Sequence, residues 1–385
     1  MRILIACDKF KGSLAASAAC AAIARGMRKR FPDAEIDECP IADGGEGFAE
    51  ALAAPLGGQW VEVAAHDALG RPVMAKYLLT RTDGKVVAVM EMAGASGLWR
   101  IGEGERDILS ANSCGTGEMI RHAIEISGAE KIVIGLGGSA TNDGGAGMAT
   151  ELGVRFLDAN GNAIKPSPGA LAGCLAKIDL SGYRKPPPIV VACDVDSPLL
   201  GPLGATRVFG PQKGADAATM PILEAALEAI VRCSAGEQTA TRPGSGAAGG
   251  LGFGLIHFAV AEMMPGFEIV ASLSGLEKRI EAADIVITGE GSLDAQTLAG
   301  KGPAGVARLA RKYHHPVWAF CGRADLSARN SGLFDRITEL ALTGLPVNVL
   351  LSRAASLLTD LASGDKSSMD AKDILASSER ESVEG

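Results

Sequence analysis

The stretch Ile132–Gly147, which reads IVIGLGGSATNDGGAG, decides the fold that the sequence predicts. Its first residues, Ile132–Leu136, form a β-branched apolar run that is typical of a buried strand. A glycine-rich loop follows, and an apolar helical pattern begins around Met148. Glycine allows the backbone to approach an anion closely, and the N–H groups of a helix N-terminus point toward it. The order of strand, loop and helix therefore predicts a phosphate-binding cradle, with a plain tight turn as the structural alternative.

The segments that precede this stretch alternate between strand and helix. Arg2–Cys7 and Ile36–Cys39 are expected strands, and each is followed by an apolar helical pattern, the first with Ser13 as its predicted N-cap. The alternation resumes with a strand at Ile285–Thr288, for which Gly289–Asp294 is the expected exit loop. This pattern is typical of a parallel sheet with helices on its faces.

The middle of the chain departs from this alternation. Val73–Leu79 and Val86–Met92 flank Asp83-Gly84, which is a hairpin signal. Antiparallel strands at this point indicate a further domain that begins near residue 62. A second glycine-rich loop is expected at Gly244–Gly254.

Composition narrows the class of protein. The 385 residues suggest two domains, and 47% hydrophobic residues with 4% aromatic residues suit a close-packed α/β protein. A net charge of −8 without a basic stripe disfavours nucleic-acid binding. The eight cysteines are scattered and form no CxxC pair, as expected of reduced thiols in a cytoplasmic protein. Neither a signal peptide nor a membrane span is expected.

Residues capable of chemistry follow several of the expected strands. In open α/β sheets ligands bind beyond the carboxyl ends of the strands. The candidates at such ends are Asp8, Lys11, Asp43, Asp143, Asp194, Asp196, Glu290 and Asp294. So many carboxylates require compensating charge, for which Mg²⁺ and the lysines Lys11, Lys213 and Lys301 are the natural choices. Lys213 lies in Pro211–Gly214, which is either a plain turn with a solvated lysine or an anion contact.

Two nucleotide-binding patterns need comparison with the glycine-rich stretch. The Walker A pattern GxxxxGK[ST] is absent from the sequence, so a P-loop fold is excluded. Gly135–Ala140 fits G-x-G-x-x-A after a strand, and Asp158 ends a later strand-like run, as in a dinucleotide-binding fingerprint. Thr141–Gly145 prolongs the loop where that fingerprint needs a helix, which favours a nucleotide phosphate and its metal over NAD.

Motifs spread over residues 1–325 resemble those of bacterial class I glycerate kinases. The matching stretches, in family order, are Phe10–Leu14, Ala42–Gly47, Ala95–Leu98, Gly115–Glu118, Ile134–Met148, Cys193–Pro202, Phe209–Ala215, Gly246–Gly254 and Thr288–Pro303. The chain departs from the family at Lys9, where a serine is usual, at Cys114, where an aromatic residue is usual, and after about Leu345. The number and length of the motifs make the resemblance specific.

The resemblance implies phosphorylation of D-glycerate with ATP and Mg²⁺, with 2-phospho-D-glycerate as the expected product. It also implies a two-domain α/β fold. Residues 1–62 and 270–385 would form a discontinuous Rossmann or flavodoxin-like domain with a parallel sheet. Residues 63–269 would form an inserted mixed α/β domain, with the active site in the cleft between the two. The polar tail from about residue 363 is expected to be mobile.

Phosphoryl transfer requires positioning, charge neutralisation and a group that orients or deprotonates the acceptor hydroxyl. The predicted nucleotide-binding residues are Gly137, Gly138, Ser139, Thr141, Asn142, Asp143 and Gly144. Asp194 and Asp196, with Glu290, are the expected Mg²⁺ ligands. Lys11 and Lys301 would receive the substrate carboxylate and the transferred phosphoryl group. Asp8, Asp43 or Asp294 would act on the hydroxyl, and the sequence does not choose among them.

Two other classes of function stay open at this point. One is an NAD(P)-dependent oxidoreductase acting on a small hydroxyacid, and the other is a non-catalytic nucleotide-binding protein. The expected partners are small molecules, D-glycerate and ATP, and the sequence leaves a homodimer open.

Overall fold

The computed structural model describes residues 1–298 and 302–364. Lys301 and all but the first two residues of the predicted tail, which was expected from about residue 363, lie outside this range. The chain divides into two compact units. Unit 1 contains Met1–Asp43, Glu50–Pro55 and the described residues from Phe267 onward. Unit 2 contains Gly44–Ala49 and Leu56–Gly266. Two helices have residues in both units, namely α2 (Phe48–Leu56) and α11 (Gly266–Ser274).

Unit 1 is built on a five-stranded sheet in the order β13-β12-β11-β1-β2. Its strands are β1 (Arg2–Cys7), β2 (Glu35–Glu38), β11 (Ile285–Leu293), β12 (Val317–Ala324) and β13 (Arg336–Glu339). All neighbouring strands are parallel. Numbered within the unit, the order is 2-1-3-4-5, which is the flavodoxin-like order and reverses direction between β1 and β11. The prediction of a flavodoxin-like parallel sheet is confirmed.

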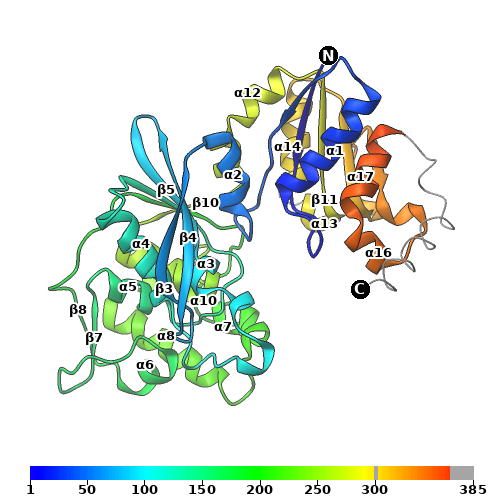
Figure 1. Ribbon diagram of the computed structural model, residues 1–385. Coiled ribbons are helices and arrows are strands. Elements are labelled where there is room, and N and C mark those ends of the chain that lie inside the picture. The colour runs from blue at the N-terminus through cyan, green and yellow to red at the C-terminus, as the bar shows by residue number, and fades with distance from the viewer. Residues whose placement is uncertain (299–301, 365–385) are drawn as a thin grey trace, which may run out of the picture. The chain divides into compact units, whose positions relative to one another are not determined.

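Helices cover this sheet, and one helix pair is packed unusually closely. The remaining elements of unit 1 are α1 (Ala16–Arg30), α12 (Leu276–Glu281), α13 (Ala295–Leu298), α14 (Gly302–Lys312), α15 (Leu326–Arg329), η4 (Leu340–Thr343), α16 (Val347–Ser352) and α17 (Ala354–Ser363). Helix α17 lies alongside α1 (Figure 1). A Cβ atom at Gly26 of α1 would lie 2.3 Å from the main-chain oxygen of Thr359 in α17, so only glycine permits this approach.

Unit 2 contains a six-stranded mixed sheet in the order β10-β9-β6-β5-β4-β3. Its strands are β3 (Gln59–His66), β4 (Pro72–Thr82), β5 (Lys85–Glu91), β6 (Lys131–Gly135), β9 (Ile189–Ala192) and β10 (Glu262–Met264). The strands from β10 to β5 are parallel, and β4 and β3 are antiparallel additions. Asp83 and Gly84 both have positive φ between β4 and β5, which confirms the predicted hairpin turn.

The core of unit 2 lies between this sheet and its helices. The other elements are α3 (Ala93–Ser96), η1 (Leu98–Arg100), η2 (Glu103–Glu105), α4 (Cys114–Glu125), α5 (Ala146–Glu151), β7 (Arg155–Leu157), α6 (Pro168–Cys174), β8 (Lys177–Asp179), α7 (Ala205–Phe209), η3 (Pro211–Lys213), α8 (Met220–Ser234), α9 (Glu237–Ala240) and α10 (Ala247–Ala259). Ile132 and Ile134 of β6 pack in one buried cluster with Met119 and Ile120 of α4 and with Leu251 of α10. The strand–loop–helix order of the opening stretch is confirmed as β6, loop and α5.

Three local predictions are wrong. Strand β11 does not end at Thr288 but continues to Leu293, because it keeps pairing with β12, so Glu290 belongs to a strand. Ser13 does not cap α1, and its hydroxyl donates to the main-chain oxygen of Leu351 instead. The expected loop at Gly244–Gly254 becomes helical from Ala247, with a left-handed turn at 248–250.

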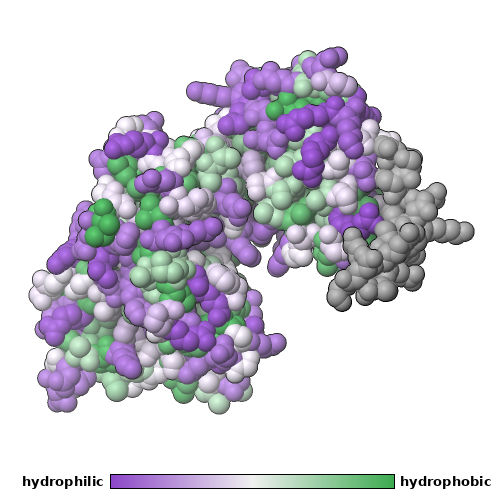
Figure 2. Space-filling model, viewed as in Figure 1, coloured by the Kyte–Doolittle hydropathy of each residue, from purple (hydrophilic) through white to green (hydrophobic). Residues whose placement is uncertain are grey.

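The surface gives no indication of a membrane-spanning element. Among the described residues, no helix combines the length and the apolar character needed to cross a bilayer. On the face seen in Figure 2, hydrophilic residues predominate and the apolar residues form small separate patches.

Candidate functional site

Four carboxylates of unit 1, which we call the acidic cluster, gather where the sheet order reverses. Its members are Asp8, Asp43, Glu290 and Asp294. Asp8 directly follows β1, and Glu290 lies in β11 one residue beyond Gly289, which pairs with Cys7. The register of two parallel strands therefore places these carboxylates at the same edge of the sheet, where ligands bind in such folds. The four carboxylates lie together in unit 1, and their role in a site stays a prediction.

The environment of Glu290 is both buried and negative. Burial, together with the smaller effects of the charges of Asp8, Asp294 and Asp43, raises the pKa of the Glu290 carboxyl to about 7. The Thr297 hydroxyl opposes this shift by donating a hydrogen bond of 2.5 Å to Oε1 of Glu290. A proton or a cation is therefore held readily at this carboxylate.

Of the lysines near the acidic cluster in the sequence, Lys9 forms an ion pair with it and Lys11 does not, among the described residues. Lys9, where the resemblance leads one to expect serine, places Nζ 3.4 Å from Oδ1 of Asp43, and its amide donates to Oδ1 of Asp8 at 2.6 Å. Lys11 is exposed and forms no ion pair with any described residue. Lys301 lies outside the described residues. The role of Lys9 was not predicted, because the sequence shows only that it stands beside Asp8.

Asp294 begins the short helix α13. Its Oδ1 accepts from the amides of Gln296 at 2.8 Å and Thr297 at 3.3 Å. The Asp294 amide in turn donates to the Thr297 hydroxyl at 3.1 Å. Thr297 therefore joins Glu290 and Asp294, a connection that the sequence did not indicate.

In unit 2, the loop Leu136–Gly145, which we call the glycine loop, joins β6 to α5. Its accessible part is Gly137 and Gly138, while Ser139 is 7% exposed. Among the described residues, the amides of Gly137, Gly138 and Ser139 donate to no protein acceptor. Such successive amides at the end of a parallel strand can bind an anion.

Neighbouring segments hold the accessible part of the glycine loop in place. The Leu98 amide donates to the Gly138 oxygen at 2.8 Å, and the Ala140 amide donates to the Ser96 oxygen at 3.0 Å. A Cβ atom at Gly137 would lie 2.4 Å from the Cα atom of Gly45, so two glycines permit this backbone contact. The loop is thus fixed before any ligand arrives.

Thr141, Asn142, Asp143 and Gly144, which were predicted to bind nucleotide, are buried inside unit 2. Asp143 accepts four hydrogen bonds, from the amide and hydroxyl of Ser113 at 2.8 and 2.7 Å and from the amides of Gly145 at 3.2 Å and Gly147 at 3.0 Å. Burial raises the pKa of Asp143, and these hydrogen bonds oppose the shift. Asp143 thus joins the N-termini of α4 and α5, a structural role that the sequence did not indicate.

Lys213 of η3 lies beneath the same loop and is only 2% exposed. Its Nζ donates to the main-chain oxygen of Thr141 at 2.7 Å. Burial lowers the pKa of the Lys213 ammonium to about 7, while the charge of Asp143 acts to raise it. Of the two alternatives left open for Lys213, the solvated lysine in a plain turn does not hold, because the side chain is buried.

Asp194 and Asp196 follow β9, and both are exposed. Oδ1 of Asp194 accepts from the Gly266 amide at 2.9 Å. Among the described residues, no three His, Cys, Asp or Glu side chains are grouped so that they could hold a metal ion. Carboxylate oxygens suit Mg²⁺, which commonly takes only one or two protein carboxylates together with substrate phosphates and water. The donor chemistry of this pair therefore fits Mg²⁺, and the three-residue ligand set with Glu290 stays a prediction.

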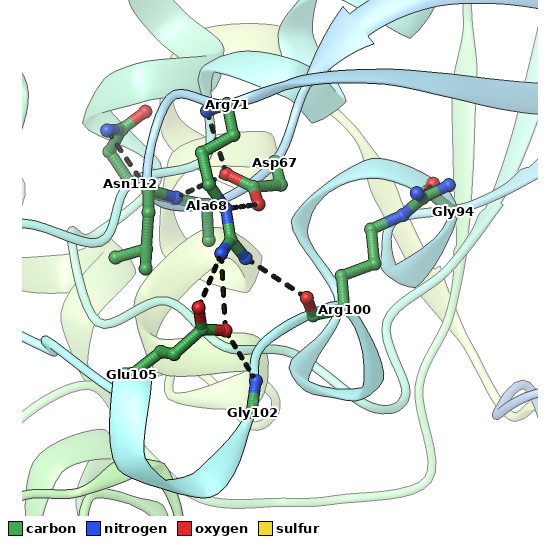
Figure 3. Close-up of polar contacts among 9 residues, drawn as sticks. Asp67, Ala68, Arg71, Gly94, Arg100, Gly102, Glu105 and Asn112 are labelled. Carbon is green, nitrogen blue, oxygen red and sulfur yellow. Dashed lines mark hydrogen bonds and ion pairs between the residues drawn. The ribbon is translucent and has the colours of Figure 1, made fainter.

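An ion-pair network centred on the buried Asp67 supports the segment that holds the glycine loop (Figure 3). The Arg71 guanidinium contacts Oδ2 of Asp67 at 2.6 Å, both carboxylate oxygens of Glu105 at 3.2 Å and the oxygen of Arg100 at 3.1 Å. Burial acts to raise the pKa of Asp67, but hydrogen bonds from Arg71 and Leu69 outweigh it and lower the pKa. The network fixes the chain beyond Leu98, and no motif in the sequence indicated it.

The structure also disfavours the dinucleotide fingerprint. Helix α5 begins at Ala146, six residues after the position where the fingerprint requires a helix already packed against the strand. Asp158 follows β7, which pairs with β8 in a separate two-stranded sheet. Its side chain accepts from the amides of Asn160 and Asn162. It is therefore a turn residue rather than the acidic residue at the end of the neighbouring parallel strand.

Comparisons with known proteins agree on one family. The sequence model of the glycerate kinase family matches residues 3–364. The chain is 44% identical over 366 residues to a glycerate kinase of Bacillus subtilis (strain 168), covering 93% of this chain and 95% of the relative. It is 46% identical over 328 residues to the glycerate 2-kinase of Escherichia coli (strain K12), covering 84% and 85% of the two chains.

A solved structure shares the fold along nearly the whole chain. It is a crystal structure described as that of a glycerate kinase 2 from Salmonella typhimurium LT2, with a TM-score of 0.81 and 40% sequence identity. The match covers 97% of this chain and 99% of that one. Together with the family match, it shows that this chain belongs to the glycerate kinase family and is a phosphotransferase enzyme of that family.

Proposed function

We propose that this enzyme transfers the terminal phosphoryl group of ATP to the 2-hydroxyl of D-glycerate, giving 2-phospho-D-glycerate and ADP. The observation that carries the proposal is the 46% identity with the E. coli glycerate 2-kinase over 84% of this chain. The relative's name supplies the choice of the 2-hydroxyl, and ATP as donor is the expectation drawn from the sequence.

The acidic cluster supplies the groups that act on the acceptor hydroxyl. Transfer forms a bond between the glycerate 2-oxygen and phosphorus and breaks the bond to the ADP oxygen, and the hydroxyl proton passes to a carboxylate. Asp8, Asp43 and Asp294 are the proposed acceptors of that proton, and the grouping of all three around Glu290 supports this role. Lys11 and Lys301 are the proposed partners of the substrate carboxylate and the transferred phosphoryl group.

The glycine loop supplies the proposed contacts to the nucleotide phosphates. The amides of Gly137, Gly138 and Ser139 have unused donors among the described contacts, and Gly137 and Gly138 are also accessible. For Thr141, Asn142, Asp143 and Gly144, burial supports an indirect contribution, because these residues fix the loop from within. The prediction that residues of both units contribute to one active site stays a prediction.

Asp194 and Asp196 are the proposed protein ligands of Mg²⁺, with Glu290 as the predicted third. The ion would neutralise charge on the phosphates during transfer. The exposed position of the two aspartates on one short loop after β9 supports their access to a nucleotide.

³¹P NMR of the enzyme with ATP, Mg²⁺ and D-glycerate tests the reaction and its position at once. The expected result is loss of the γ-phosphate signal with growth of a phosphomonoester signal coupled to the single proton on carbon 2. A signal coupled to two protons, from carbon 3, would refute the 2-position and retain the kinase. If ATP stays unchanged with D-glycerate while NAD(P) is reduced or oxidised, the kinase proposal fails.

A further inference from the structure

The feature that the proposed reaction leaves unexplained is the buried ammonium of Lys213. Placing a charge in the interior is costly, and an apolar side chain of similar length would fill the same space without that cost. Lys213 is 2% exposed, and Nζ has a single described hydrogen bond, to the Thr141 oxygen at 2.7 Å. A lysine that served only packing would be a poor choice here, so its charge and its contact require an explanation.

The contact of Lys213 is directed at the inner half of the glycine loop. Thr141, whose oxygen accepts the hydrogen bond from Lys213, follows Gly138 by three residues. At most about 11 Å of chain therefore separates Thr141 from Gly138. The loop is also fixed by Ser113 through Asp143 and by the Gly144 amide, which donates to the Gly249 oxygen at 3.1 Å. Lys213 is the one cation among these described contacts.

One buried polar atom beneath the glycine loop lacks a hydrogen-bond partner among the described residues. Nδ2 of Asn142 donates to the Thr206 hydroxyl at 3.0 Å, whereas its buried Oδ1 has no hydrogen-bond donor among the described residues. An ammonium can donate three hydrogen bonds, and Lys213 uses one described acceptor. Lys213 therefore has donor capacity beyond its one described contact, next to a buried acceptor that has no described donor.

We infer that Lys213 is a positioning residue for the nucleotide phosphates, which fixes the Thr141 carbonyl and sets a positive charge beneath the amides of Gly137, Gly138 and Ser139. The inference rests on the proposed use of ATP. Asp143 is the charged group that acts on Lys213 most directly. Removing Lys213 removes a positive charge beneath the loop and leaves the Asp143 carboxylate with its hydrogen bonds alone, so the electrostatic potential at the amides becomes less favourable to anions.

The size of the effect follows from one charge at a moderate distance. At an effective dielectric constant of about 20, a full unit charge on the order of 10 Å from an anionic group changes its affinity by about an order of magnitude. This is the upper bound for Lys213, because a pKa of about 7 leaves the ammonium partly neutral at pH 7. Lys213→Met removes the charge and keeps the length of the side chain. We expect it to raise the Kd for ADP with Mg²⁺ and the KM for ATP by up to about ten-fold, with a smaller change in kcat and in the KM for D-glycerate.

The test combines isothermal titration with ADP and Mg²⁺, initial rates and thermal unfolding. Lys177→Met, at an exposed lysine of β8 in the same unit, is the matched control and should leave Kd and KM unchanged. Titration reports on the folded protein, so an altered Tm does not obscure the affinity. Unchanged affinity for ADP and an unchanged KM for ATP in Lys213→Met would overturn the inference.

A second variant separates the charge from the hydrogen bond. Lys213→Gln keeps a donor for the Thr141 carbonyl without the charge, and affinity weakened to a similar extent in both variants supports the inference. Full recovery of affinity in Lys213→Gln would show a purely structural contact and would overturn it. A wild-type enzyme that neither binds ADP nor phosphorylates D-glycerate would instead refute the proposed function.

Discussion

Replacement of Asp143 tests whether the glycine loop is held by a structural carboxylate or uses that carboxylate for nucleotide binding. Asp143→Ala leaves four buried donors without an acceptor, namely the amide and hydroxyl of Ser113 and the amides of Gly145 and Gly147. Each lost hydrogen bond costs about 1 kcal/mol, which gives about 4 kcal/mol in total. Burial raises the pKa of Asp143, so removing the carboxylate also relieves a desolvation cost. We therefore use a low value for the free energy lost with each hydrogen bond.

For a unit of this size, about 4 kcal/mol corresponds to a decrease in Tm of about 10 °C. The assay is differential scanning calorimetry, with Asp158→Ala as a control because that aspartate is a partly exposed turn residue whose acceptors serve only its own turn. Titration of the folded variant with ADP and Mg²⁺ should give a Kd within a few-fold of wild type. A Tm within about 1 °C of wild type, together with a large loss of ADP affinity, would refute the structural role and restore direct binding by Asp143.

Three further predictions concern separate parts of the chain. Gly26→Ala should lower stability by about 2 kcal/mol, because the new Cβ would lie 2.3 Å from a main-chain oxygen of α17. The control Gly173→Ala, whose Cβ would have no atom within 4 Å, should be neutral or stabilising in thermal unfolding. Arg71→Ala should cost about 2 kcal/mol at pH 7 by leaving the buried Asp67 carboxylate short of donors. The pKa of Asp67 is lowered in the folded protein, so this contribution to stability is present above the unfolded pKa of about 3.9. It is lost as the pH falls through the pKa of the folded state. A difference in denaturation midpoint between Arg71→Ala and wild type that persists undiminished at pH 3 would contradict the reasoning. Asp194→Ala should reduce kcat on the order of 10²-fold with little change in Tm, and retained activity with an unaltered Mg²⁺ requirement would reject its role as a metal ligand.

The sequence was sufficient to predict those elements whose own residues show a strand or turn pattern. Arg2–Cys7 is a strand with the predicted bounds, and the Asp83-Gly84 hairpin follows from the need for two residues with positive φ. The gathering of Asp8 and Glu290 was predictable as well, since the carboxyl ends of parallel strands share one edge of a sheet.

Features that depend on distant partners were not predictable from one sequence. The extension of β11 to Leu293 is decided by pairing with β12, and the hydroxyl of Ser13 is taken by a main-chain oxygen more than three hundred residues away. The burial of Lys213 depends on where η3 places its side chain, and lysine in a Pro-Gln-Lys-Gly turn otherwise indicates solvent exposure. Asp143 was recognised as a chemical group, but its structural partners could not be inferred from spacing.

The pairing of β1 with β11 has a consequence for how the protein is made. Ile3 aligns with Ile285, so one edge of β1 has no neighbour until about 280 further residues have left the ribosome. At translation rates of about 5–20 residues per second, that interval is about 15–60 s. Unit 2 is encoded almost entirely within this interval and can fold during it. The first strand of the nascent polypeptide is thus synthesised early, and its pairing in the sheet is completed late.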